Sequence, residues 1–139
     1  VAATGEMRLY AGNGSGGFTN WVRIGNGWGP LRALTVAETG RGVGVYAIYE
    51  GKLRYYAGDG RGGFSFRQDF ASDWGSTARL IAVGDWVGSS HADLLSVDKN
   101  GLMYVHAGSA GSAEPGPAIQ VGRGWGPMRA IGVASQKRA

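Results

Sequence analysis

Short runs of apolar or alternating apolar and polar residues are separated by glycine-rich turns along most of the chain. The runs at 31–36, 44–49, 52–56 and 64–70 are rich in β-branched and aromatic residues, which favours strands. No stretch keeps the three-and-four apolar spacing of a helix for about ten residues without meeting a glycine. The pattern therefore predicts an all-β protein without a helix of ordinary length.

These runs belong to a unit that occurs three times, as two landmarks show. One landmark is a glycine that follows a strand-like run, and the other is a tryptophan further along the unit. The glycines are Gly12, Gly58 and Gly108, and the tryptophans are Trp28, Trp74 and Trp125. Their spacings are 46 and 50 residues for the glycines and 46 and 51 for the tryptophans. Because both landmarks share one period, we predict a single repeat domain over residues 1–139, with four strands in each unit.

The frame of the repeat is permuted. Residues 131–139 stop where the middle unit would continue, and residues 1–8 supply a loosely similar version of what comes next. In toroidal folds such a frame lets the N-terminal strand complete a unit opened by the C-terminus, which removes exposed sheet edges. Four strands in about 46 residues fit a β-propeller blade, and a β-trefoil of three units is the alternative. Because propellers usually have four to eight blades, three blades predict a homo-oligomer, with a six-bladed dimer as the simplest ring.

The composition is that of a folded, cysteine-free chain with a modest positive charge. Of 139 residues, 27 are glycine and none is cysteine, and 43% are hydrophobic. Disulfides, thiolate nucleophiles and cysteine zinc ligands are therefore excluded. The net charge of +4 is spread along the chain, with only Lys137 and Arg138 adjacent, so we expect no nucleic-acid surface. No apolar run approaches the roughly 18 to 20 residues of a membrane helix, so we expect no membrane insertion.

Several short segments are similar to known propeller families. Asn20-Trp21, the Ile-Gly-Asn-Gly-Trp run at 24–28 and the Gly-Lys-Leu-Arg-Tyr run at 51–55 resemble the tachylectin type of β-propeller lectin. Residues 83–101 instead resemble the FG-GAP or VCBS propeller repeat of secreted bacterial proteins. The first resemblance implies binding of N-acetylated amino sugars, such as N-acetylglucosamine, in pockets between blades. The second implies a secreted, extracellular protein.

The chain also departs from both families. The FG-GAP loop binds calcium through alternate oxygen ligands, whereas the matching positions here are Asp85, Val87, Ser89 and Asp93. Since calcium takes six to eight oxygens, several of them from carboxylates, we expect no tight metal site and no cofactor. The Asn-Trp pair of the first unit has no counterpart at 66–69 or 115–118, which predicts unequal sugar sites.

Candidate sugar-binding residues recur with the repeat. A sugar site needs an aromatic face for the apolar side of the ring and planar polar groups that hold its hydroxyls and acetamide. Each unit places a tryptophan near a small polar or charged residue, and the first unit adds an Asn-Trp pair. The predicted carbohydrate-binding residues are Asn20, Trp21, Asn26, Trp28, Asp73, Trp74, Arg123 and Trp125. A second interpretation stays open, in which the once-per-unit tryptophans pack as wedges between units.

Catalytic groups are sparse. Ser89, His91 and Asp93 stand close in sequence, but a catalytic triad assembles from distant segments around an oxyanion hole. Asp85 and Asp93 would serve glycoside hydrolysis only at a suitable separation. We therefore expect no enzyme and no catalytic residue, but a lectin with repeated sites for N-acetylglucosamine-like sugars that gains avidity from several weak sites. The alternative is a non-catalytic structural or interaction segment of a secreted, cell-wall-associated protein.

Overall fold

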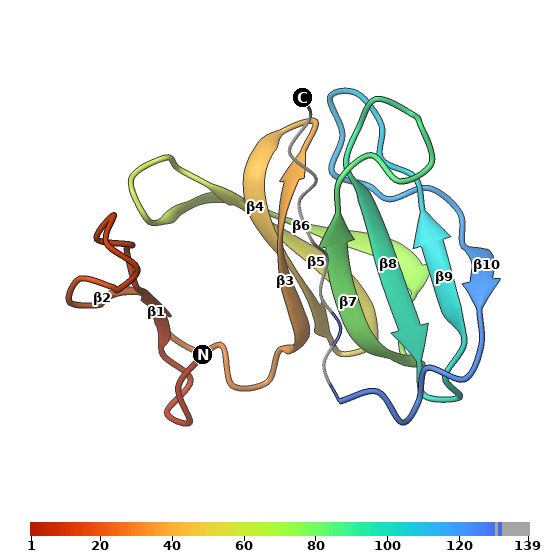
Figure 1. Cartoon of the computed structure of the whole chain (residues 1–139), viewed down its shortest axis with the longest axis horizontal. Helices are drawn as coiled ribbons and strands as arrows, with labels where there is room; N and C mark the ends of the chain where they lie inside the picture. The colour runs from red at the N-terminus through yellow and green to blue at the C-terminus, as the bar shows by residue number, and fades with distance from the viewer. Residues whose placement is uncertain (130, 132–139) are drawn as a thin grey trace.

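The computed structural model describes residues 1–129 and 131, which form ten strands in three antiparallel sheets (Figure 1). The strands are β1 (Met7–Leu9), β2 (Val22–Gly25), β3 (Arg32–Thr39), β4 (Gly42–Tyr49), β5 (Lys52–Gly58), β6 (Phe64–Asp73), β7 (Thr77–Val83), β8 (Asp93–Asp98), β9 (Met103–His106) and β10 (Ile119–Gly122). No helix occurs in this part of the chain. The prediction of an all-β protein is therefore confirmed.

Two of the three sheets contain the four strands predicted for each unit. They have the strand orders β3-β4-β5-β6 and β10-β9-β8-β7, and each strand pairs with its neighbour along the chain. The first unit contributes only the pair β1-β2, so three four-stranded sheets are not formed by the described residues. No sheet closes on itself into a barrel there, and no ring of blades is complete. The segment expected to open a further unit, 131–139, lies outside the described residues except for Ile131.

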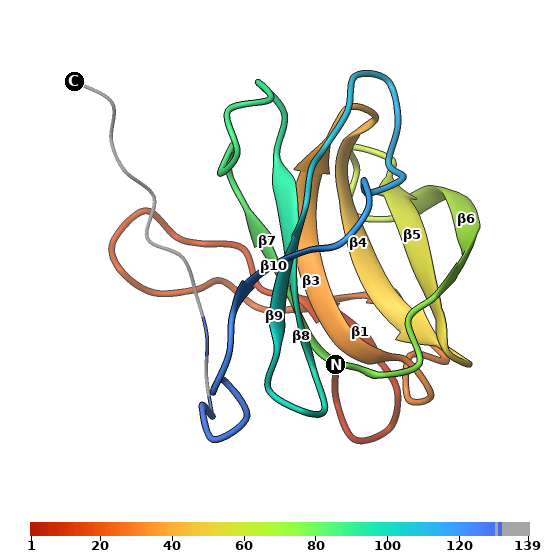
Figure 2. The same ribbon diagram turned by 90° about the vertical axis from the view of Figure 1, so that its right-hand side faces the viewer.

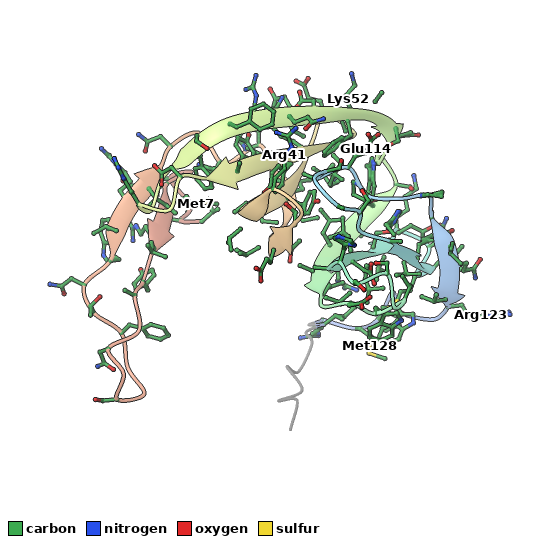
Figure 3. The ribbon with its side chains drawn as sticks, turned by 90° about the horizontal axis from the view of Figure 1, so that it is seen from above. Met7, Arg41, Lys52, Glu114, Arg123 and Met128 are labelled. Carbon is green, nitrogen blue, oxygen red and sulfur yellow. The ribbon has the colours of Figure 1, made fainter. Side chains whose placement is uncertain are left out.

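The sheets are stacked side by side along an open arc. β3 and β7 are neighbours in the middle of the molecule, and the Ala82 amide on β7 donates a hydrogen bond of 3.0 Å to the Thr35 hydroxyl on β3 (Figures 1 and 2). The two four-stranded sheets face each other across the main core. From above, the β1-β2 pair lies at one end of the arc, near Met7, and Arg123 and Met128 lie at the other (Figure 3).

The period-two alternation of strands decides which residues enter the core between the two larger sheets. Leu53, Tyr55 and Ala57 are buried on β5, whereas the intervening residues are more exposed. They pack with Ile48 of β4 and with Leu80 of β7. A smaller cluster on the opposite side of β4 and β5 joins this sheet to the β1-β2 pair.

All three units share a tight contact between a glycine and the following tryptophan, which we call the glycine–tryptophan junction. The tryptophan amide donates a hydrogen bond to the carbonyl of a glycine in the preceding turn. The pairs are Trp28 and Gly5 at 2.9 Å, Trp74 and Gly51 at 2.8 Å, and Trp125 and Gly101 at 3.0 Å. The three glycines have φ between +77° and +81°, a conformation that side chains disfavour. A Cβ on Gly101 would also lie 2.7 Å from the Gly126 amide nitrogen.

A long connection between β9 and β10 is fastened to the neighbouring sheet. The buried Tyr46 hydroxyl on β4 donates a hydrogen bond to the Ala113 carbonyl of this connection. At the β3-β4 turn, a Cβ on Gly40 would lie 2.5 Å from the Gly111 amide nitrogen, so only glycine permits this approach. The connection is thereby held across the seam between the two sheets.

Removal of the Tyr46 hydroxyl should measure how firmly this connection is held. Tyr46→Phe leaves the buried Ala113 carbonyl without its partner, so we expect the free energy of unfolding in urea to fall by about 1–2 kcal/mol. The matched control is Tyr49→Phe, because the Tyr49 ring is partly exposed under the Arg54 guanidinium. A change within about 0.5 kcal/mol is expected there. Equal losses in both variants would contradict the assignment.

Candidate functional site

A cavity of about 600 Å³ opens at the seam between the two four-stranded sheets. Its lining comes from the end of β6 and the turn that follows, from β8 and β9, and from the β9-β10 connection. The polar and aromatic lining residues are Ser72, Asp73, Trp74, Ser76, Thr77, Ser96, Asp98, Tyr104, His106 and Glu114. Residues 115–118 of the connection complete the wall. Two of the predicted sugar-binding residues, Asp73 and Trp74, are therefore brought to one site.

Trp74 forms part of the floor of this cavity and also packs between the sheets. Only 6% of the residue is exposed, and its indole nitrogen donates a hydrogen bond of 2.9 Å to the Ser72 hydroxyl. The indole lies against the His106 ring, with centroids 4.5 Å apart and planes inclined by 35°. Tyr104 is less buried than Trp74, so it is the aromatic side chain more accessible to a ligand.

His106 is held in one neutral tautomer by its neighbours. Its Nδ1 lies 3.1 Å from the Gly116 carbonyl, which only accepts, so Nδ1 carries the proton. Nε2 then accepts the hydrogen bond of 2.9 Å from the Ser96 hydroxyl. Burial lowers the pKa of His106 from its usual value, partly opposed by the Gly116 carbonyl. The imidazole is therefore uncharged at neutral pH.

Three carboxylates, those of Asp73, Asp98 and Glu114, give the cavity its polar character. One oxygen of Asp98 accepts hydrogen bonds from the amides of Asn100 and Leu102, at 2.9 and 3.0 Å. One oxygen of Asp73 likewise accepts from the Gly75 amide, at 2.8 Å. These bonds fix both carboxyl groups in place, and among the described residues no lysine or arginine lines the cavity to neutralise them. The site therefore offers preorganised acceptors for N–H and O–H donors.

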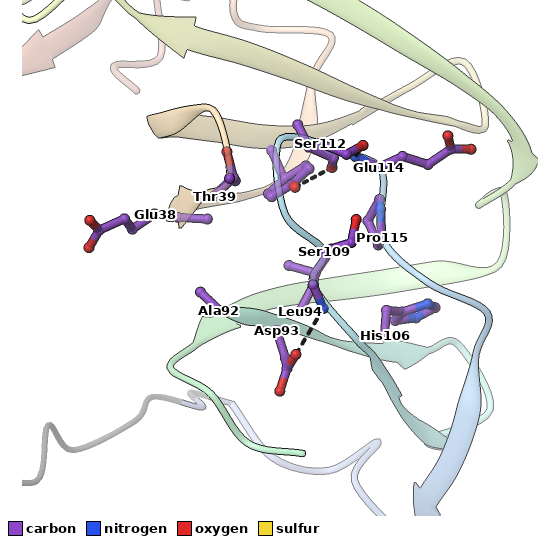
Figure 4. A pocket seen from close by; sticks show the side chains of 15 residues that line it. Glu38, Thr39, Ala92, Asp93, Leu94, His106, Ser109, Ser112, Glu114 and Pro115 are labelled. Atoms are coloured by element: carbon purple, nitrogen blue, oxygen red, sulfur yellow. Dashed lines mark hydrogen bonds between the residues drawn. The ribbon is translucent and has the colours of Figure 1, made fainter. Parts of the chain in front are cut away.

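A narrower crevice adjoins the cavity, and His106, Glu114 and Pro115 line both (Figure 4). It lies between the β3-β4 turn and the β9-β10 connection, where Asp93 accepts a hydrogen bond of 2.9 Å from the Gly108 amide. Its volume of about 10 Å³ corresponds to a single water molecule. It is too small for a sugar, so the larger cavity is the candidate site.

The predicted residues of the first unit lie elsewhere. Trp28 is 5% exposed and packs against Tyr56 and Phe64, with ring centroids 4.5 and 5.2 Å away. Trp21 is exposed, and the Arg8 guanidinium lies 4.1 Å from its ring centroid. Asn20 and Asn26 are exposed on loops, and none of these predicted residues lines the described cavity.

The predicted residues of the third unit, Arg123 and Trp125, lie after β10 at the end of the arc. Trp125 is partly buried against the cluster that contains Met103 and Val105. Its carbonyl accepts a hydrogen bond of 3.1 Å from the Arg79 guanidinium. These two residues, like those of the first unit, stay predictions as sugar ligands.

Sequence reasoning found only Asp73 and Trp74 of this cavity and missed the rest of its lining, including Asp98, Tyr104, His106 and Glu114. His106 is one of only two histidines in the sequence, and no motif surrounds it. The repeat contained a signal, because His106 occupies the position before the Ala-Gly pair that holds Tyr10 and Tyr56 in the other units. In the second and third units this position faces the preceding unit's tryptophan.

The loop before β8 uses its acidic residues to hold backbone amides. Asp93 is 2% exposed, and one of its oxygens accepts from the amides of Trp86 and Val87, at 2.7 and 2.9 Å. Asp85 accepts from the Ser90 amide, at 3.0 Å. Within the described residues, no three His, Cys, Asp or Glu side chains are grouped so that they could hold a metal ion.

Ser89 and His91 do not form a nucleophile–base pair. The Ser89 hydroxyl lies 3.4 Å from the His91 carbonyl, and His91 Nδ1 lies 2.9 Å from the Ser89 carbonyl. Both contacts use a backbone oxygen, so the imidazole does not face the hydroxyl as general base catalysis requires. The contacts order the loop locally.

Comparisons of the chain with protein-family models, curated proteins and solved structures found no match. Across the described residues, the chain forms no helix of the length and apolar character that a membrane crossing demands. The chemistry of the cavity therefore rests on its own lining residues.

The neutral His106 makes stability depend on pH. Its pKa is lowered in the folded protein, so the unfolded chain, with a pKa of about 6.5, binds more protons as the pH falls. The free energy of unfolding should therefore be highest above this value and decline between about pH 7.5 and 5.5, by at most about 1.4 kcal/mol per pH unit. Urea unfolding at several pH values measures the slope.

His106→Gln should flatten this pH dependence. The matched control, His91→Gln, should retain the pH dependence, because it leaves His106 unchanged. His91 lies on the loop before β8, where its ring is bonded to the Ser89 carbonyl. A slope that survives in the His106 variant would show that another group is responsible.

Proposed function

We propose that this chain is a carbohydrate-binding protein, and that the cavity beside Trp74 and His106 binds an amino sugar of the N-acetylglucosamine type. The observation that carries the proposal is the meeting of aromatic side chains with fixed carboxylates in one open cavity between the sheets. Its volume of about 600 Å³ falls in the range of small-ligand sites.

The lining provides both kinds of contact that a pyranose needs. Tyr104 and Pro115 offer apolar surface for the carbon-bound hydrogens of the ring and for the acetamide methyl group. Asp73 and Asp98 offer charged acceptors for hydroxyl groups and for the acetamide N–H. Because both carboxyl groups are already held by backbone amides, little conformational entropy is lost when a ligand binds.

The proposal includes the wider arrangement of the chain. The two four-stranded sheets would be neighbouring propeller blades, with the site in the seam between them. The open arc of sheets would belong to a homo-oligomeric ring, and the protein would act outside the cell, without catalysis. Several weak sites on one ring would give avidity for a surface that displays many sugars.

The alternative is a structural or interaction segment of a cell-wall-associated protein that binds no sugar. The burial of Trp28 and Trp74, at 5% and 6% exposed, favours this alternative, because both rings already have packing partners. Tryptophan fluorescence separates the two functions. A saturable change on addition of N-acetylglucosamine supports binding near Trp74, whereas an unchanged spectrum supports packing alone.

A charge-neutral substitution at Asp98 tests the site directly. Asp98→Asn keeps an oxygen for the amides of Asn100 and Leu102 but removes the charge that faces the cavity. We expect the affinity for N-acetylglucosamine or its short oligomers, measured by calorimetry, to fall roughly tenfold or more.

Asp59→Asn is the matched control, since Asp59 holds the amides of Arg61 and Gly63 in the same way, at 2.7 and 2.9 Å, but does not line the cavity. Its affinity should equal that of the unaltered protein. If both variants bind alike, or if the unaltered chain binds no amino sugar, the proposed site is wrong.

A further inference from the structure

The two seams between neighbouring sheets repeat one aromatic contact. At the first, Trp28 lies against Tyr56 of the next unit, with centroids 4.5 Å apart and planes inclined by 45°. At the second, Trp74 lies against His106 of the next unit, at 4.5 Å and 35°. The partner ring stands each time directly before the Ala-Gly pair of its unit. The tryptophan of one unit is therefore matched to a ring on the unit that follows.

One tryptophan and one ring of this series have no such partner among the described residues. Tyr10 precedes the Ala-Gly pair of the first unit, where Tyr56 and His106 stand in the others. It is 49% exposed, with only an edge-on contact to Phe18, which is itself 73% exposed. At the other end, Trp125 has the same backbone junction as Trp28 and Trp74 but lies against no aromatic ring.

The two unmatched groups lie at opposite ends of the arc. β1-β2 is at one end and the segment from Arg123 to Met128 is at the other, so one chain cannot join its own Trp125 to its own Tyr10 in this conformation (Figure 3). Each end also exposes apolar side chains, including Val22 at the first and Val121 and Met128 at the second. These exposed apolar side chains are available for contact with a second protein surface.

We propose that a second copy of this chain occupies each end, so that Trp125 of one copy packs on Tyr10 of the next. This interface repeats the aromatic contact found inside the chain. It pairs a unit's tryptophan with the ring before the Ala-Gly pair of another unit, as at Trp28 and Tyr56 and at Trp74 and His106. It is head-to-tail, with different surfaces on the two copies, so repeated contacts generate a ring if the rotation closes. The inference rests on the homo-oligomeric ring of the proposed function and specifies its contact, but it can fail or hold apart from sugar binding, since the Trp74 cavity is lined by one chain.

The mass in solution tests the interface. Light scattering over a concentration series should give masses above the 14.5 kDa of one chain. Tyr10→Ala should raise the concentration at which association is half complete by at least about tenfold, because it removes the ring that Trp125 covers. Trp86→Ala is the matched control, since Trp86 is an exposed aromatic on the loop before β8, and it should leave the mass unchanged. A mass of one chain at every concentration overturns the proposal.

Cross-linking tests the head-to-tail geometry without altering the two rings. The chain has no cysteine, so Thr19→Cys near one end and Arg123→Cys near the other each introduce a single thiol on an exposed residue. A bismaleimide added to a mixture should join the two variants to each other much faster than it joins either variant to itself. Trp86→Cys gives the collisional background. Links mainly between identical variants would show a two-fold interface or one with a different partner and would overturn the inference.

Discussion

The glycine–tryptophan junction is the interaction on which the arrangement of this protein depends. A backbone hydrogen bond joins each tryptophan amide to a glycine carbonyl, at Trp28, Trp74 and Trp125. In the two four-stranded units the bond ties the end of the last strand to the turn between the middle strands, and in the first unit it ties the segment after β2 to the turn before β1. It thus sets where the chain leaves one sheet and enters the next. Glycine is favoured at all three positions because φ is positive, and at Gly101 also because the segment after Trp125 passes too close for a Cβ.

The indole ring that extends from this junction serves two roles at once. Trp74 seals the core between the two larger sheets and also contributes to the floor of the cavity at their seam. Packing between units and lining a cavity for a ligand, the two roles considered for the recurring tryptophans, are therefore compatible at Trp74. At Trp28 the ring packs against Tyr56 and Phe64 and is 5% exposed.

The seams differ because the residue facing the tryptophan differs. Tyr56 makes the first seam aromatic, and the pocket near it is lined by Leu9, Ile24, Val43 and several glycines. His106 makes the second seam polar, because its two nitrogens draw Ser96 and the Gly116 carbonyl into a buried network. The two seams therefore differ in chemistry although they share one arrangement of strands.

The sequence by itself determined the all-β character and the four strands of the second and third units, because alternation along a strand and glycine turns are local properties. It also identified Asp73 and Trp74, which stand next to each other in the chain. Only the tertiary structure decided that Asp98, Tyr104, His106 and Glu114 join them, since these residues come from another sheet and from the β9-β10 connection. The ring that the next unit places against each tryptophan was likewise decided by the tertiary structure, because Trp28 and Tyr56, and Trp74 and His106, lie far apart in the chain and meet only where the sheets stack.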